Sequence, residues 1–110
     1  MGITLTDRSH GDATVVVVEG EIDVHTAPDL RERLLSLIGG GVVPIVDLSE
    51  VGFLDSSGLG ALAGVNKQLE THGNRLRIVC ADPKLVRLFS LTRLDEVLTL
   101  HPTIEDATGG

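Results

Sequence analysis

The residues whose types and spacing best suit chemistry are Asp55, Ser56 and Ser57, which lie between an apolar stretch and a run of small residues. A hydroxyl at the entrance to a helix is exposed and lies beside backbone N–H groups that have no partner inside the helix. Such a serine could cap the helix, act as a nucleophile or accept a phosphate. The surrounding sequence must discriminate between these three roles.

Capping is the simplest role for this segment. Asp55, Ser56 and Ser57 are all preferred N-cap residues, and one cap contributes about 1 kcal/mol. A cap does not require the small residues that follow, which are Gly58, Gly60, Ala61, Ala63 and Gly64. Since a glycine inside a helix costs roughly 0.5–1 kcal/mol relative to alanine, we expect a close approach here, either by the sheet beneath or by a partner above.

Nucleophilic catalysis and nucleotide binding have little support. A nucleophilic serine needs a base and an oxyanion hole, but the segment is not a Gly-x-Ser-x-Gly elbow, and only His25 could approach it. A helix N-terminus attracts anions, yet the flanking chain has neither a phosphate-binding loop nor a nearby basic residue. We therefore expect no catalytic residue and no tight nucleotide binding, while weak nucleotide binding stays open.

Phosphorylation is the third role, and the charge pattern predicts its effect. The formal net charge is −7, and all of it lies in residues 1–66, which hold ten acids and three bases. A phosphoserine adds about −1.5 to −2 charge, Asp55 is adjacent, and no lysine or arginine occurs between Leu34 and Asn66. Phosphorylation is therefore predicted to repel a partner and to switch binding off.

The composition excludes several other function classes. The acidic chain has no basic surface for nucleic acid, and its longest apolar run, residues 15–18, is too short to cross a membrane. Cys80 is the only cysteine and the four histidines share no ligand spacing, so we expect no disulfide, metal or cofactor. Asp7 and Asp12 interrupt the stretch where a secretory leader needs apolar residues, so a cytoplasmic protein is expected.

The elements that must position the serines follow from hydrophobic periodicity and turn residues. We expect strands over 3–6, 13–19, 42–48, 76–81 and 97–100, an acidic loop after residue 48, and helices from about residues 26, 57 and 83, with 103–107 as a terminal helical turn. Because helices connect the later strands of this β-β-α-β-α-β-α-β order, those strands should be parallel. The prediction is one α/β domain over 1–110, a mixed sheet with helices packed mainly on one face.

The chain resembles the bacterial anti-sigma factor antagonists, members of the STAS domain family. The resemblance rests chiefly on Asp55-Ser56-Ser57-Gly58-Leu59-Gly60 after the strand at 45–48. Gly20-Glu21-Ile22-Asp23 and Leu91-Thr92-Arg93-Leu94 support it, and it covers almost the whole chain. It implies that the predicted sheet and helices form a single STAS domain.

The resemblance also implies a mechanism. Ser56 would accept phosphate from an anti-sigma factor that is itself a serine kinase, and a phosphoserine phosphatase would remove it. The unphosphorylated chain would bind the anti-sigma factor and release a sigma factor, without being an enzyme. Asp23 and Asp55 would shape the partner surface, and Ser57 would support and cap the site rather than accept phosphate, with Gly58, Leu59 and Gly60 around it.

Two alternatives stay open, together with the question of what anchors a partner. A STAS module without a phosphoswitch, such as a scaffold or a transporter-associated partner, could lack the serine or its aspartate, whereas both are present here. A serine hydrolase would show ester turnover that Ser56→Ala abolishes. Phe53 and Phe89 are the only aromatic residues, so the apolar contacts are expected from Leu54, Leu59 and Leu62, with a place in the core as the equal alternative for Leu54. The resemblance leaves room for a weak homodimer and gives no reason to expect membrane association.

Overall fold

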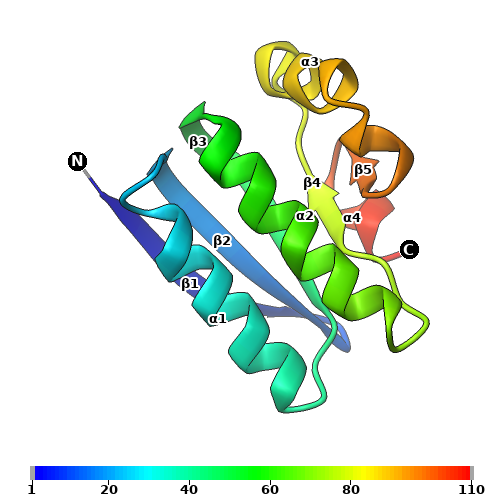
Figure 1. Cartoon of the computed structure of the whole chain (residues 1–110). Helices are drawn as coiled ribbons and strands as arrows, with labels where there is room; N and C mark the ends of the chain where they lie inside the picture. The colour runs from blue at the N-terminus through cyan, green and yellow to red at the C-terminus, as the bar shows by residue number, and fades with distance from the viewer. Residues whose placement is uncertain (1, 110) are drawn as a thin grey trace.

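The computed structural model describes residues 2–109 and contains one five-stranded sheet in the order β1-β2-β3-β4-β5 (Figure 1). The elements follow the chain as β1 (Ile3–His10), β2 (Ala13–Ile22), α1 (Ala27–Gly39), β3 (Pro44–Leu54), α2 (Ser56–Glu70), β4 (Arg77–Val79), α3 (Pro83–Leu91), a 3₁₀ turn η1 (Leu94–Glu96), β5 (Thr99–His101) and α4 (Ile104–Ala107). Their order confirms the predicted alternation of strands and helices.

The sheet is mixed, as predicted. Strands β1 and β2 form an antiparallel hairpin, and each later strand pairs in parallel with its neighbour. Gly11 takes a φ of +63° in the hairpin turn, a conformation that side chains other than glycine rarely adopt. Because β2, β3 and β4 are parallel, their carboxyl ends lie at one edge of the sheet, and α1, α2 and α3 all begin there.

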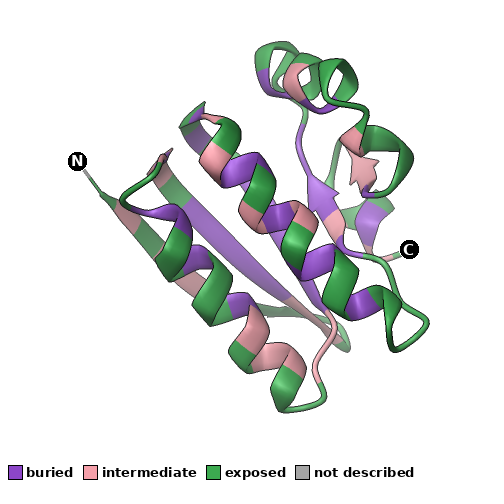
Figure 2. Ribbon diagram, viewed as in Figure 1, coloured by how far each residue is buried: buried purple, intermediate pink, exposed green. Residues whose placement is uncertain are grey.

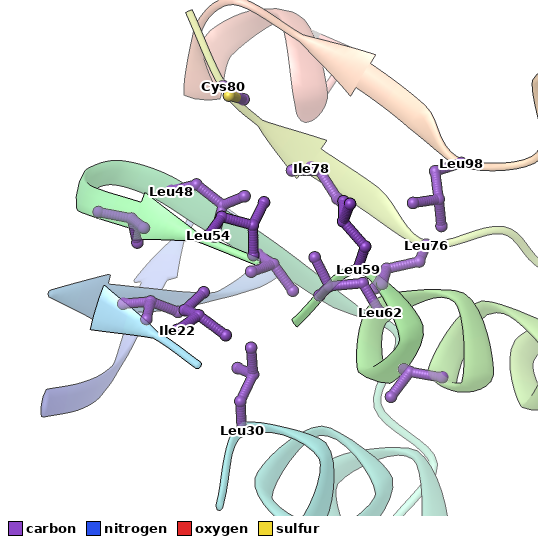
Figure 3. Packing of buried hydrophobic residues seen from close by; sticks show 14 of the residues in the cluster. Ile22, Leu30, Leu48, Leu54, Leu59, Leu62, Leu76, Ile78, Cys80 and Leu98 are labelled. Carbon is purple, nitrogen blue, oxygen red and sulfur yellow. The ribbon is translucent and has the colours of Figure 1, made fainter. Parts of the chain in front are cut away.

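Most of the core lies between one face of the sheet and the helices α1, α2 and α3, which confirms the predicted one-sided packing (Figure 2). Ile22, Leu30 and Leu62 meet there and are fully buried (Figure 3). A smaller cluster on the opposite face holds Val15, Val17, Ile45 and Val79 beneath Ala107 of α4. The first helical turn of α2 therefore rests on the larger of two apolar layers.

The main difference from the prediction is the length of β2 and β3. The expected loop after residue 48 is strand as far as Leu54, because β2 also continues and pairs with it up to Ile22. Two irregularities in register, between Val17 and Glu19 and between Gly20 and Glu21, allow this long pairing to bend. The extended β3 delivers the serine segment directly from the sheet edge, without an intervening loop.

Smaller differences concern the ends of elements. Helix α2 begins at Ser56 rather than at about Ser57, whereas α3 begins at Pro83 as predicted, after the N-cap Asp82. Strands β4 and β5 are shorter than expected, and η1 was not predicted. Arg93 precedes η1 with a left-handed φ of +61°, which nothing in the local sequence signals.

Candidate functional site at the start of helix α2

Asp55 is the residue that caps α2. Its backbone is extended, and its Oδ1 atom accepts hydrogen bonds from the N–H groups of Ser57 and Gly58 at 2.9 and 3.2 Å. Its own N–H donates to the carbonyl of Ile22 at 3.2 Å, which ties the end of β3 to the end of β2. The capping role that three residues could have filled thus falls to the aspartate, and both serine hydroxyls are spared from it.

The two serines differ in exposure. Ser56 is the first residue of the helix and is exposed, and its hydroxyl forms no hydrogen bond with any other residue of 2–109. Ser57 is half-buried and lines a hollow between α1 and α2. His25 is the only histidine that was expected to approach the serines. In the described structure of residues 2–109, it forms no hydrogen bond with Ser56 or Ser57. The geometry therefore offers an accessible hydroxyl but no nucleophile–base pair.

The anion-binding position of this helix is already occupied. The N–H groups of a first helical turn carry the positive end of the helix dipole and favour a negative group. Here the Asp55 carboxylate takes the N–H groups of Ser57 and Gly58. A bound phosphate or nucleotide would have to displace this side chain, so the site does not resemble a nucleotide-binding helix terminus.

Asp23 organises the neighbouring loop between β2 and α1. Its Oδ1 atom accepts hydrogen bonds from the N–H groups of His25 at 2.9 Å and Thr26 at 3.0 Å. The Thr26 hydroxyl accepts from the Asp23 N–H and donates to the carbonyl of Glu21. The bond from the His25 N–H is the main cause that lowers the pKa of Asp23. This aspartate therefore fixes the shape of the loop rather than being an ordinary exposed acid.

The glycines after the serines do two different things. A Cβ atom on Gly58 would lie 2.6 Å from Cγ2 of Ile22 and would also clash with Leu54. The close approach there is to the sheet beneath. A Cβ on Gly60 would meet nothing within 4 Å outside its own helical turn, so no packing contact among residues 2–109 accounts for that glycine.

The expectation that Leu59 and Leu62 provide surface contacts is wrong, and for Leu54 the alternative of a core residue is confirmed. Leu54, Leu59 and Leu62 are buried in the core, so their side chains cannot serve as surface anchors. Phe53 is 48% exposed at the end of β3, and Val24 is 61% exposed in the Asp23 loop. The signal for Val24 was available in the sequence, since a large apolar residue between Asp23 and His25 sits in a polar turn where burial is difficult.

A hollow of about 350 Å³ opens beside Ser57, between the first turns of α1 and α2. Val24, Ala27 and Pro28 line one side, and Gly60 and Ala61 the other. Arg31 of α1 also lines it. The flanking sequence contains no base, but the packing of α1 against α2 brings this arginine into the same hollow as Ser57.

Comparison with known proteins identifies the class of protein that this fold and site define. The STAS domain family model matches residues 4–107. An anti-sigma factor antagonist from Mycobacterium paratuberculosis, known as a crystal structure, superposes with a TM-score of 0.88 at 35% identity, covering 97% of this chain and 92% of that one.

Two further relatives make the class more specific. The anti-sigma-B factor antagonist of Bacillus subtilis is 33% identical over 105 residues, which are 96% of both chains. The phosphorylated form of the Bacillus cell fate determinant SpoIIAA superposes with a TM-score of 0.71 at 25% identity, covering 97% of this chain and 96% of that one. The chain thus belongs to the anti-sigma factor antagonists of the STAS domain family, which are regulatory proteins and not enzymes.

Other kinds of site find no support in the described part of the chain. No group of three or more His, Cys, Asp or Glu side chains within residues 2–109 could hold a metal ion. Over the same residues, no helix has both the length and the apolar character needed to cross a membrane.

Proposed function

We propose that this protein is a phosphorylation-controlled antagonist whose phosphoacceptor is Ser56. Unphosphorylated, it binds an anti-sigma factor with serine kinase activity and releases a sigma factor. Phosphate on Ser56 ends that binding, and a phosphoserine phosphatase restores it. The observation that carries the proposal is the exposed Ser56 hydroxyl, which has no partner within residues 2–109, beside a helix terminus that Asp55 already caps.

The direction of the switch follows from the occupied cap. A phosphate on Ser56 adds about −1.5 to −2 charge next to the Asp55 carboxylate, which holds the two N–H groups that would otherwise stabilise it. Two like unit charges 4 Å apart repel by about 1 kcal/mol in water, and by more when a partner excludes the solvent. The phosphate therefore disfavours a docked partner without requiring a change in the fold.

The partner surface is best formed by the loop around Asp23 and the junction around Asp55. The exposed side chains of Val24 and Phe53 provide apolar anchors at this edge, and the two aspartates provide acidic groups that suit a basic face on the partner. The relatives support the proposed function as a whole, because one is named an anti-sigma-B factor antagonist and another is known in a phosphorylated form.

The test is ATP-dependent phosphorylation in a lysate of the native organism, read by intact mass and peptide mapping. Wild type is compared with Ser56→Ala and with Ser57→Ala, which is the matched control one residue further along the helix. One phosphate on wild type and on Ser57→Ala, but none on Ser56→Ala, is the expected result. Loss in Ser57→Ala alone would move the site by one residue. No phosphate on any variant, with the lysate kinases active on a control substrate, would favour a constitutive STAS binding module.

A further inference from the structure

We infer that the hollow between α1 and α2 is a socket for a segment of the anti-sigma factor that places an apolar side chain against Val24 and Ala61 and a carboxylate on Arg31. The inference rests on the proposed function and gives the chemistry of the partner at this surface. It is carried by three features of the hollow, namely an unexplained glycine, an arginine without an ion pair, and an exposed valine at the rim.

Gly60 is the first of these features. It lies in the second turn of α2, where a glycine costs roughly 0.5–1 kcal/mol relative to alanine, and it is exposed. Gly58, two residues earlier, is explained by its contact with Ile22 and Leu54, but a Cβ on Gly60 would meet no atom of residues 2–109 within 4 Å beyond its chain neighbours and the local backbone of its own helix. An approach from outside the chain gives a physical reason for the absence of a side chain.

Arg31 is the second feature. Only three bases occur in residues 1–66, and Arg33 forms an ion pair with Asp7. Arg31 forms no ion pair with any residue in the range 2–109, and its Nε lies 3.9 Å from the Cβ position of Gly64. The small residues of α2 thus let the arginine lie across the helix, where its guanidinium is available to a carboxylate. An arginine in this arrangement suits bidentate pairing with an acid.

Charge complementarity decides between the kinds of partner that could fill the hollow. The rim near Asp23 and Asp55 is acidic and suits basic groups, whereas Arg31, further along the hollow, suits an acid. A partner segment with a base towards the serine edge, an apolar residue in the middle and an acid over Arg31 matches this order. A segment with only basic residues would place a like charge on Arg31, so the arrangement selects register as well as partner.

The test uses the full chain and a recombinant anti-sigma factor of the native organism that has serine kinase activity, with the dissociation constant measured by calorimetry. Arg31→Glu and Gly60→Leu are each expected to weaken binding roughly tenfold or more. The matched control is Lys67→Glu, which changes the net charge by the same amount as Arg31→Glu. Lys67 is exposed in the last turn of α2, so this change should leave the dissociation constant within about twofold. Because Gly60 has open space and an ordinary helical φ, the leucine variant should remain folded, as circular dichroism can verify.

The outcomes separate this inference from the proposed function. If wild type is neither bound nor phosphorylated, the proposed function fails and the inference fails with it. If wild type binds and both Arg31→Glu and Gly60→Leu bind equally well, the switch stands and the socket is wrong. If only Gly60→Leu weakens binding, the inferred pairing of Arg31 with a carboxylate of the partner is wrong. Recovery of Arg31→Glu binding by a Glu→Lys or Asp→Lys change in the partner segment would support the assigned pair directly.

Discussion

The two glycines at the start of α2 allow a paired experiment in which the same substitution has opposite effects. Gly58→Ala and Gly60→Ala add the same methyl group to the same helix, two residues apart. Alanine gains roughly 0.5–1 kcal/mol over glycine in a helix, chiefly because it lowers the entropy of the unfolded chain. That gain is common to both variants, so it cancels when one is compared with the other.

What does not cancel is the packing beneath Gly58. The new Cβ would lie 2.6 Å from Cγ2 and 3.3 Å from Cβ of Ile22, a β-branched side chain that is fully buried and has little rotamer freedom. Leu54 is the other clash, and its terminal methyl group could move more easily. Overpacking of this kind costs about 1–3 kcal/mol. Gly60→Ala should therefore be more stable than Gly58→Ala by about 1–3 kcal/mol, and more stable than wild type by up to about 1 kcal/mol.

Urea unfolding followed by circular dichroism measures this difference, with the m-value as a check that both variants unfold in the same way. For a domain of this size the difference corresponds to roughly 4 °C in Tm for each kcal/mol. Equal free energies of unfolding for the two variants would refute the assignment of Gly58 to close packing and of Gly60 to the surface. A less stable Gly60→Ala would also count against it.

Three further predictions concern the cap, the loop and the thiol. Asp55→Ala should lower the free energy of unfolding by about 1 kcal/mol, whereas Asp55→Asn should retain most of it because asparagine caps equally well; an alanine variant as stable as wild type would contradict the cap. The pKa of Asp23 is lowered from its ordinary value of 3.8 in the folded protein, so the ionised side chain stabilises the fold. Wild type should therefore be more stable than Asp23→Asn above pH 4, and this difference should be lost as the pH falls through the lower folded-state pKa. Tm curves of the two proteins that run parallel from pH 7 to pH 2 would disprove this prediction. Only 4% of Cys80 is exposed, and this burial raises the pKa of its thiol. Its reaction with a disulfide reagent at pH 8 should therefore be at least roughly tenfold slower in the native protein than in urea. Similar rates in the two conditions would show that the thiol is accessible.

The features that were predictable from the sequence depend on neighbours close along the chain. Asp82-Pro83 starts α3 as expected because both the cap and the first helical residue are local signals. The prediction that one of three residues caps α2 is confirmed, with Asp55 as the one that does so. The order of elements and their parallel pairing also follow from periodicity and the helical connections.

The features that were missed depend on pairing and packing between distant segments. The extension of β3 to Leu54 passes two irregularities in its register with β2, at each of which β3 has one residue more than β2, and this pairing between distant segments does not follow from the periodicity of either strand. The place of Arg31 beside Ser57 depends on how α1 lies against α2 (Figure 1). Asn66 is a further example, since it is a polar residue on the buried face of α2. Its Oδ1 accepts a hydrogen bond from the N–H of Leu76 at 2.8 Å, a contact that the sequence near Asn66 does not indicate.

The position of the proposed phosphoacceptor, Ser56, relative to the cap determines what a phosphate could do there. A phosphate on an N-cap residue would lie at the positive end of the helix dipole and would be stabilised by about 0.3–1 kcal/mol, so that modification would strengthen the helix. Ser56 is instead one residue inside the cap, and the carboxylate of Asp55 already holds the N–H groups of Ser57 and Gly58. Added charge at Ser56 would gain little from the two N–H groups that Asp55 already holds and would be repelled by that carboxylate. In the proposed switch, the same aspartate would therefore both cap the helix and leave the phosphate at the surface, where it would act on a partner rather than on the fold.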